Sequence, residues 1–343
     1  MQSVHSPILC SYAAPNVRRS LPWALLLILV LPLGCARETA TRIDIKGGDQ
    51  YVRGALAYQE GDRERAVIAL QEALRENPNL IMARFLLGSL YKDKGHYEAA
   101  AEQYKKVVDL DPYVYSNHYN LGLVNHLLNR LQEAAASYLQ ALSLKPDDLK
   151  SNMYLGLVYT ALGKPDVGLP YARRAAEIEP RSAEATANLA VVYDALAEYG
   201  PAELAYRRAI ELDPSRIETV VNLAGNLAAQ KRFKEAISVY EQIFKTADSS
   251  LLRQRYGYAL LQNGQTDEAI RQFNSALKAN PRNYQAMNGI ADALLAQYRQ
   301  SAMLDEKKRT QAIDHYRKSL ALNGEQPRVA ALVREYTNTA LFP

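Results

Sequence analysis

The sequence predicts an all-α fold, a solenoid of stacked helical hairpins. Three features of the chain predict it: a proline that recurs every 34 residues, paired small residues at fixed places between the prolines, and apolar residues at helical spacing. The prolines are Pro78, Pro112, Pro146, Pro180 and Pro214, and the spacing continues to Asp248 and Pro281. A period this regular is typical of a repeat array and is not required by a single globular core.

Each unit carries two small residues at which two helices can cross closely. The first is Gly54, Gly88, Gly122, Gly156, Ala190, Ala224, Gly257 or Ala291. The second is Ala66, Ala100, Ala134, Gly168, Ala202, Ala236, Ala269 or Ala312. A large side chain, usually Tyr or Phe, stands four residues after the second small residue, with Ala172 as the exception. We expect these rings to fill the space beside each crossing.

Helix ends are marked in the same units. Gly61, Gly95, Asn129, Gly163 and Gly264 fall at one fixed place between the two apolar stretches. A left-handed residue ends a helix there at little cost. The proline then ends the second helix, because proline lacks the backbone donor that a helix interior needs. The sequence therefore predicts an array of eight two-helix units over residues 47–324.

The end of the array differs from the rest. Residues 301–309 are an insertion that contains Met303, Leu304 and charged residues. We expect it to lengthen both helices and form a solvated turn, although a docking knob is an alternative. Residues 325–343 hold an apolar stripe, which predicts a capping helix followed by a tail. The stripe consists of Val329, Leu332, Val333 and Tyr336.

At this point the chain resembles the tetratricopeptide repeat (TPR) family, and in particular its exported bacterial lipoproteins. The second unit shows the family pattern of Leu-Gly, Tyr, Ala, Tyr and Pro at Leu87-Gly88, Tyr91, Ala100, Tyr104 and Pro112. The resemblance implies a right-handed superhelical solenoid of about eight hairpins, with a C-terminal capping helix and a concave groove lined by first helices. It also implies binding of a protein or an extended peptide.

Three asparagines occupy one equivalent position on the expected first helices: Asn120, Asn188 and Asn222, with Tyr154 interrupting the series. A carboxamide both donates and accepts hydrogen bonds. The series resembles the asparagine ladder of repeat-containing glycosyltransferases, which implies contact with a peptide backbone. The alternative is that these amides satisfy neighbouring backbone groups.

Other expected groove residues form an apolar group toward the amino end and an acidic group in the middle. The apolar group is Met82, Phe85, Tyr119, Leu123, Met153 and Leu157, and the acidic group is Glu184, Asp194 and Glu218. Either group could instead serve packing between neighbouring units. The Lys/Asn clamp of co-chaperone relatives is absent, because Phe85 and Ser89 hold those positions.

The amino terminus predicts export. Arg18-Arg19 precede an apolar stretch, Leu21–Leu33, that is too short for a spanning helix, so residues 1–34 are predicted to be a signal peptide. Leu33-Gly34-Cys35 resembles a bacterial lipobox, which implies lipidation of Cys35 and a lead-in linker over 35–46. An ordinary secretory signal or a retained signal anchor are the alternatives.

Composition and motifs argue against other classes of function. The chain has 41 basic and 37 acidic residues, so it lacks the strongly basic balance of nucleic-acid-binding proteins. His118 and His126 are about 12 Å apart along one helix, too far to share a metal ion. We therefore expect no catalytic residue, no metal, no cofactor and no small-molecule substrate.

These observations predict a non-enzymatic adaptor that is lipid-anchored in the cell envelope, at the periplasmic face of the outer membrane in a Gram-negative cell, and that assists assembly or export machinery. Three alternatives stay open: a soluble secreted or periplasmic protein, an accessory or substrate-recognition subunit of an enzyme system such as a glycosyltransferase, and a cytoplasmic scaffold with a wrongly assigned start.

Overall fold

The computed structural model describes residues 46–338, which fall into two compact units, residues 46–151 and 152–338. The described residues form seventeen α-helices and no strand, as the sequence predicts. The predicted signal peptide, Cys35 and most of the lead-in linker lie outside them.

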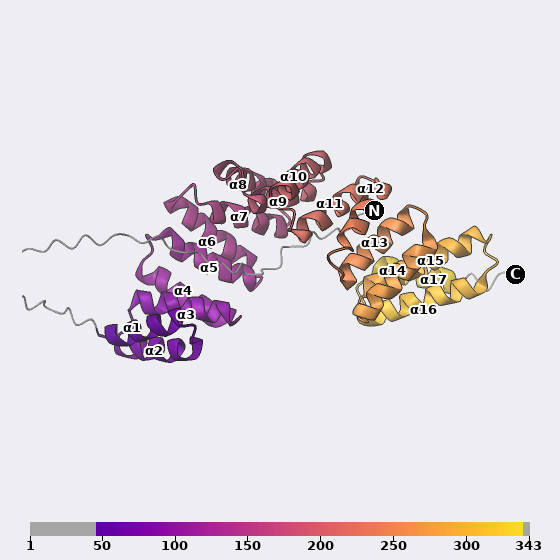
Figure 1. Cartoon of the computed structure of the whole chain (residues 1–343). Coiled ribbons are helices and arrows are strands. Elements are labelled where there is room, and N and C mark those ends of the chain that lie inside the picture. Colours follow the sequence, from indigo (N-terminus) through magenta and orange to yellow (C-terminus); the bar gives the residue numbers. More distant parts are fainter. Residues whose placement is uncertain (1–45, 339–343) are drawn as a thin grey trace, which may run out of the picture. The chain divides into compact units, whose positions relative to one another are not determined.

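The amino-terminal unit consists of three consecutive helical hairpins (Figure 1). They are α1 (Gly48–Gln59) with α2 (Arg63–Glu76), α3 (Ile81–Asp93) with α4 (Tyr97–Leu110), and α5 (Tyr115–Leu127) with α6 (Leu131–Leu144). Each proline that separates these hairpins lies in the loop just after a second helix, where its missing N–H costs no helical hydrogen bond.

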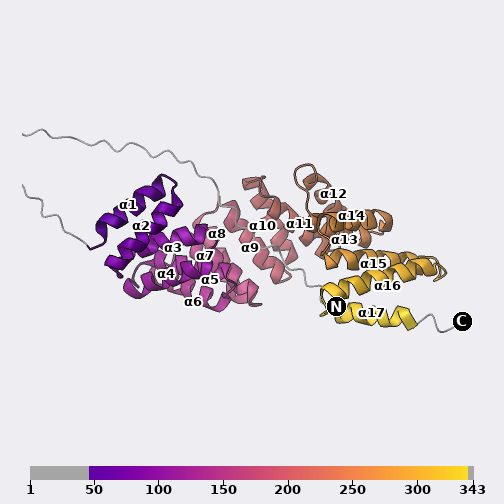
Figure 2. The same ribbon diagram turned by 90° about the horizontal axis from the view of Figure 1, so that it is seen from below.

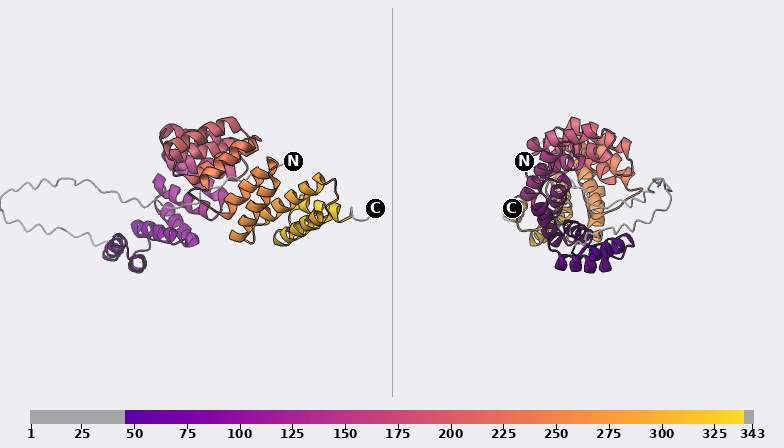
Figure 3. Two further views of the ribbon diagram at one scale, coloured as in Figure 1. Left: turned by 45° about the vertical axis from the view of Figure 1, so that its right-hand side comes forward. Right: turned by 90° about the vertical axis from the view of Figure 1, so that its left-hand side faces the viewer.

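The carboxy-terminal unit continues the same pattern from within α7 (Figure 2). Its helices are α7 (Leu149–Ala161), α8 (Pro165–Ile178), α9 (Ala183–Ala195), α10 (Tyr199–Leu212), α11 (Ile217–Ala229), α12 (Phe233–Ile243), α13 (Ser250–Gln262), α14 (Thr266–Ala279), α15 (Tyr284–Gln300), α16 (Glu306–Leu322) and α17 (Pro327–Asn338). In Figure 3 the orange pair α13 and α14 is followed by the yellow helices α15 to α17.

Close helix crossings at the small residues hold each hairpin together. A β-carbon placed on Gly122 would lie 2.9 Å from the ring of Tyr138, and one on Gly257 would lie 2.9 Å from the ring of Phe273. Since carbon atoms pack at about 3.5–4.0 Å, a larger side chain would force the two helices apart. The small residues are therefore needed because the rings occupy the space that a side chain would fill.

The rings that the sequence predicts beside the crossings are buried. Tyr104, Tyr138, Tyr206, Tyr240, Phe273 and Tyr316 are all at most 1% exposed. Several tyrosine hydroxyls find partners at the edge of the core: Tyr206 donates to Asp194 at 3.0 Å, and Tyr316 donates to Asp292. Burial raises the pKa of Tyr240 to about 12, so its hydroxyl keeps its proton.

The fourth hairpin explains why Ala172 breaks the aromatic pattern. A β-carbon on Gly168 would lie 2.6 Å from the carbonyl oxygen of Gly156, and one on Gly156 would lie 3.0 Å from the β-carbon of Ala172. These distances leave no room for a ring at position 172. Tyr171 instead stacks on Tyr159, with the ring centroids 6.0 Å apart.

The turn inside each of the first seven hairpins contains one residue with positive φ. The five turn residues expected from the sequence, Gly61, Gly95, Asn129, Gly163 and Gly264, all have φ between 57° and 83°. Sequence analysis missed two further members of this series. Ala197 and Lys231 take the same conformation, with φ of 58° and 62°. They have no side chain that favours it, so only the regular spacing could have revealed them.

The last hairpin is longer than the others. Helices α15 and α16 have 17 residues each, whereas the preceding hairpin pairs helices of 13 and 14 residues. The inserted residues extend both helices and meet in a turn where Ala302 and Met303 have positive φ. Met303 and Leu304 are 58% and 82% exposed.

Helix α17 closes the carboxy-terminal end of the array. Val329 and Tyr336 are buried against Leu295, Tyr298 and Tyr316 of the last hairpin, and Leu332 and Val333 pack against the same cluster. Arg299 also donates two hydrogen bonds to the hydroxyl of Tyr336. Residues of three helices thus share one terminal core.

None of the helices in residues 46–338 is long and apolar enough to cross a membrane.

We expect Ala197→Gly and Lys231→Gly each to stabilise the chain by about 0.5–1 kcal/mol, because glycine relieves a left-handed strain of about 1–2 kcal/mol but adds entropy to the unfolded chain. The midpoint of urea unfolding would measure this. Ala136→Gly, on an exposed helical position, is the control and should destabilise by about 0.5–1 kcal/mol. Destabilisation by all three variants would contradict the assignment of strain.

Tyr104→Ala should destabilise the chain by about 3–5 kcal/mol, because it empties a buried site beside the Gly88 crossing. Since each hairpin contacts only its neighbours, the loss should be concentrated in α1 to α6. Hydrogen exchange would show this as lost protection near α3 and α4 with little change in α13 to α17. Equal loss along the whole array would contradict nearest-neighbour stabilisation.

Candidate protein-binding face

The first helices of neighbouring hairpins form one layer. Helix α9 contacts α11, α11 contacts α13, and α13 contacts α15, whereas each second helix packs mainly against first helices. In the amino-terminal unit α1 likewise contacts α3. Because first helices approach one another more closely than second helices do, their layer lies on the inside of the local curvature. Repeat arrays commonly bind partners on that side.

The side chains that face this inner side can be assigned from helix geometry. Gly122 faces Tyr138 of its own second helix, and Gly257 faces Phe273 in the same way. A residue two places earlier points about 200° away around the helix, since each residue turns by about 100°. We call the position two residues before the first small residue the inner-face position, because it is expected to line the groove. Asn120, Asn188 and Asn222 occupy it. On α15 this position holds Gly289, where an added β-carbon would lie 2.3 Å from the ring of Phe273 on α14, so there it packs against the preceding hairpin.

The three asparagines have different surroundings. Asn120 belongs to the amino-terminal unit, where its Nδ2 donates to the Ser116 carbonyl at 2.7 Å. Asn188 and Asn222 belong to the carboxy-terminal unit and are 2% and 5% exposed. Oδ1 of Asn222 is buried and has no hydrogen-bond partner within residues 46–338. Asn222 therefore offers an unused acceptor, whereas Asn120 partly satisfies its own helix.

The structure adds polar residues that sequence analysis missed. Arg255 holds the inner-face position of α13, and its Nη1 lies 3.8 Å from where a β-carbon on Gly225 of α11 would be. Gln254 Oε1 and Asn288 Oδ1 are further buried oxygens without a partner in the described part of the chain. Arg255 could have been found by counting back two residues from Gly257, since the period shortens to 33 there.

The apolar candidates mostly pack within their own units. The rings of Phe85 and Tyr104 meet edge to face at 5.7 Å, and those of Tyr119 and Tyr138 lie 6.1 Å apart. Leu123 is half-buried.

The remaining apolar candidates differ in how far their side chains are exposed. Met153 and Leu157 are buried in α7, whereas Met82 is 60% exposed. A role for any of the six in binding stays a prediction.

Asp194, one of the acidic candidates, takes part in a junction between two hairpins. Its carboxylate accepts hydrogen bonds from Asn226 Nδ2 at 2.5 Å and from the Tyr206 hydroxyl at 3.0 Å. Asn226 also donates to the Tyr199 carbonyl and accepts from Gln230. Asp194 thus joins the hairpin α9/α10 to α11. Glu184 and Glu218 have no such network and are half-buried on α9 and α11.

A second group of charged residues joins the same two hairpins. Glu203 of α10 accepts from Gln230 and Arg207 and pairs with Arg232 at 2.5 Å, and Arg232 also binds Glu235. These bonds lower the pKa of Glu203 against the opposing effect of desolvation. The acidic residues here therefore have partners from neighbouring helices.

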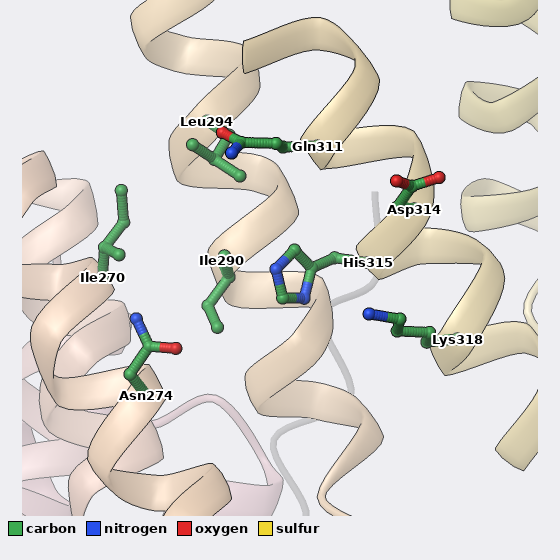
Figure 4. A pocket seen from close by; sticks show the side chains of 8 residues that line it. All are labelled: Ile270, Asn274, Ile290, Leu294, Gln311, Asp314, His315 and Lys318. Carbon is green, nitrogen blue, oxygen red and sulfur yellow. The ribbon is translucent and has the colours of Figure 1, made fainter. Parts of the chain in front are cut away.

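A cavity of about 280 Å³ lies away from the inner face, among α14, α15 and α16 (Figure 4). Ile270, Ile290 and Leu294 give it an apolar floor, and Lys318 lies on its polar side. Nδ1 of His315 is buried there without a partner in the described residues, and burial is the main cause of the lowered pKa of this imidazole.

Metal-binding chemistry finds no support in the described residues. They contain no cluster of three or more His, Cys, Asp or Glu side chains that could hold a metal ion. His118 lies close to the Pro112 carbonyl, with Nε2 at 2.8 Å, and burial lowers the pKa of His126. Both imidazoles belong to helix packing.

Comparison with known families decides the identity of the array. The model for the tetratricopeptide repeat matches residues 51–114, 85–148, 155–217 and 257–327, more than half of the chain. The chain belongs to the tetratricopeptide repeat family. TPR arrays serve as protein-protein interaction scaffolds, a generally non-enzymatic role, so the expected class of function and the expected protein or peptide partner agree with the family.

Solved TPR structures resemble this chain in fold. A TPR protein from Parabacteroides merdae is 16% identical, with a TM-score of 0.61, over 72% of this chain and 98% of its own. PilW, described as a widely conserved type IV pilus biogenesis factor, is 17% identical, with a TM-score of 0.52, over 59% of this chain and 95% of its own.

PilF of Pseudomonas aeruginosa is 21% identical, with a TM-score of 0.51, over 64% of this chain and 97% of its own. At these identities the likeness shows the fold alone. No curated protein matches the chain.

The buried carboxyl group of Asp194 predicts a pH dependence of stability. Burial raises its pKa above the ordinary value of 3.8, although the bonds from Asn226 and Tyr206 oppose this. A carboxyl group that binds its proton more tightly in the folded chain makes stability fall as pH rises from that ordinary value through the raised pKa.

We therefore expect Asp194→Asn to reduce the loss of folding stability that accompanies rising pH. Urea midpoints measured in steps from about pH 4 to pH 7 should diverge, with the variant gaining stability relative to the native chain as pH rises. The other carboxyl groups contribute equally to the stability of both proteins, so the difference between the two curves reports on Asp194. Parallel curves for the two proteins would show that Asp194 titrates alike in the folded and unfolded chains.

Proposed function

We propose that this TPR protein is a non-enzymatic scaffold that binds an extended segment of a partner protein along the inner face of its first helices. The support is the layer of α9, α11 and α13, which carries Asn188, Asn222 and Arg255 at equivalent positions. An extended backbone presents N–H and C=O groups at regular intervals, which carboxamides can bind whatever the partner's side chains are.

Asn222 carries the proposal. A buried acceptor without a partner costs roughly 1–3 kcal/mol, and a ligand that donates to it recovers this cost. The unused oxygens of Gln254 and Asn288 lie on the next two first helices, α13 and α15. These acceptors favour a ligand that supplies donors over several hairpins, as an extended peptide does.

We further propose that the array is anchored in the cell envelope through a lipid on Cys35 and that it assists assembly or export machinery there. The lipobox-like Leu33-Gly34-Cys35 supports the anchor. PilW and PilF share the fold of this chain, and PilW is described as a type IV pilus biogenesis factor. The likeness supports a role in assembly machinery for this chain as well. The scaffold role does not depend on the anchor.

The triple variant Asn120→Ala, Asn188→Ala and Asn222→Ala should lose the partner that the native chain captures from membranes. Each lost hydrogen bond is worth about 0.5–1.5 kcal/mol, so affinity for the purified partner should fall by about tenfold or more. Asn274→Ala, on an exposed site of the second-helix layer, is the control and should bind normally. Identical partner sets and affinities would rule out the asparagines as contacts.

Stability separates a binding role from a structural one. Asn222→Ala should leave the urea midpoint unchanged or raised, because the amide oxygen it removes has no partner. Asn226, one turn later on α11, is hydrogen-bonded to Asp194, and Asn226→Ala should destabilise the chain by about 1–3 kcal/mol. Equal losses in the two variants would show that Asn222 is structural.

The anchor is tested separately. We expect the mature amino terminus to be an acylated Cys35, detected by mass spectrometry of the membrane fraction, and Cys35→Ser to move the protein to the soluble fraction. Unchanged fractionation with an unmodified amino terminus would refute the anchor and leave the scaffold proposal intact.

A further inference from the structure

The lengthened last hairpin ends in an exposed apolar turn. Leu304 is 82% exposed, the largest exposed fraction of any aliphatic side chain in the described residues, and Met303 beside it is 58% exposed. Both lie between α15 and α16, the helices of 17 residues. We call residues 302–304 the tip. Two neighbouring apolar side chains left in solvent at the end of a hairpin are a candidate contact with another molecule.

The backbone of the tip is held in a defined turn. The N–H of Met303 donates to the Tyr298 carbonyl at 3.0 Å, and the N–H of Leu304 donates to the Ser301 carbonyl at 3.2 Å. Ala302 and Met303 have positive φ, 53° and 65°, a conformation that is unfavourable for a residue with a β-carbon. Their own carbonyl oxygens accept no hydrogen bond within residues 46–338. The tip therefore presents apolar side chains together with available acceptors.

The same hairpin contributes to the cavity of about 280 Å³ among α14, α15 and α16 (Figure 4). Its apolar floor consists of Ile270 and Leu294, which are half-buried, and Ile290. Two groups at its polar side are without a partner in the described part of the chain: Nδ1 of His315 makes no hydrogen bond, and the exposed ammonium of Lys318 makes no ion pair. A neutral imidazole can carry its proton on Nδ1, so both groups can donate.

We propose that the tip of one chain docks into this cavity of a second copy, whose own tip docks into the cavity of the first. The apolar side chains of the tip cover the apolar floor of the cavity. The carbonyl groups of Ala302 and Met303 accept hydrogen bonds from His315 and Lys318 of the other copy. The tip thus supplies the acceptors, and the cavity supplies the donors, that each lacks in its own chain.

Geometry favours a second copy as the occupant. Measured along α16 at 1.5 Å per residue, the tip lies about 16 Å from His315 and about 21 Å from Lys318, so it cannot reach the cavity of its own chain. One tip in one cavity is a small contact beside the roughly 1,200 Å² that a stable interface buries. Two copies related by a two-fold axis make the contact twice. An unrelated partner that carried only a tip would make it once.

Light scattering tests the association. A chain that begins at Ala36 keeps all of α1 to α17 and should form a dimer. In Leu304→Asp the dissociation constant should rise about tenfold or more, because a carboxylate is costly to bury on an apolar floor. Leu204→Asp, at a site on α10 that is 72% exposed, is the matched control and should dimerise as the native chain does.

Two results of this experiment would overturn the proposal. One is a native chain that stays monomeric up to about 100 μM, a concentration at which a contact of moderate affinity is occupied. The other is a dimer that Leu304→Asp weakens no more than Leu204→Asp does. Both side chains are exposed, so the urea midpoints of the two variants should match that of the native chain under monomeric conditions.

Disulfide trapping locates the contact. The only cysteines of the full chain are Cys10 and Cys35, so the chain that begins at Ala36 has none. Ala302→Cys chains mixed with Lys318→Cys chains in mild oxidant should form a mixed disulfide about tenfold faster than Ala302→Cys chains mixed with Lys234→Cys chains. Lys234 is an exposed lysine on α12 and serves as the control.

Equal rates for the two mixtures would overturn the proposal. So would equally fast cross-linking of Ala302→Cys chains alone, because the two tips would then touch each other instead of the cavities. Neither experiment involves the inner face of the first helices, so failure here would leave the proposed scaffold function untouched.

Discussion

The structure depends on the close crossing of two helices at a pair of small residues, with a ring beside the crossing. Gly122 and Gly257 are held so near Tyr138 and Phe273 that one added carbon would clash. The ring fills the space beside the crossing, and the glycine leaves room for it. Where the backbones approach still more closely, at Gly156 and Gly168, the ring moves to the neighbouring residue.

A hairpin built in this way cannot bury its whole apolar surface alone. Each unit therefore needs neighbours on both sides, and the units next to the ends need a substitute for the missing neighbour. Helix α17 is that substitute at one end.

Polar side chains in the array divide into two groups. Asp194, Asn226, Glu203 and Arg232 are bonded to one another across hairpins and fix the relation of neighbouring units. Asn222, Gln254 and Asn288 lie on the first-helix layer with side-chain oxygens that have no hydrogen-bond partner within residues 46–338. The first group joins neighbouring hairpins, and the second carries the proposed contact with a partner's backbone. Residue type alone does not separate them, because asparagine occurs in both.

The sequence by itself determined the helical hairpins, their boundaries and the rings of the core, because these follow from local spacing: the prolines, the small residues and the left-handed turn residues repeat in register with what each hairpin needs. It also located Asn120, Asn188 and Asn222 at one equivalent position. The positive φ of Ala197 and Lys231 could not be predicted from residue type, since neither side chain favours this conformation.

Only the tertiary structure decided which polar side chains have hydrogen-bond partners. Asp194 and Asn222 look alike as polar residues on first helices, yet Asp194 is bonded to Tyr206 and Asn226, whereas Oδ1 of Asn222 has no hydrogen-bond partner among the described residues. The reason is that one partner, Tyr206, comes from the second helix of the same hairpin and the other, Asn226, from the adjacent hairpin, 32 residues away in sequence. Their distances depend on how the units stack, which a spacing pattern does not contain.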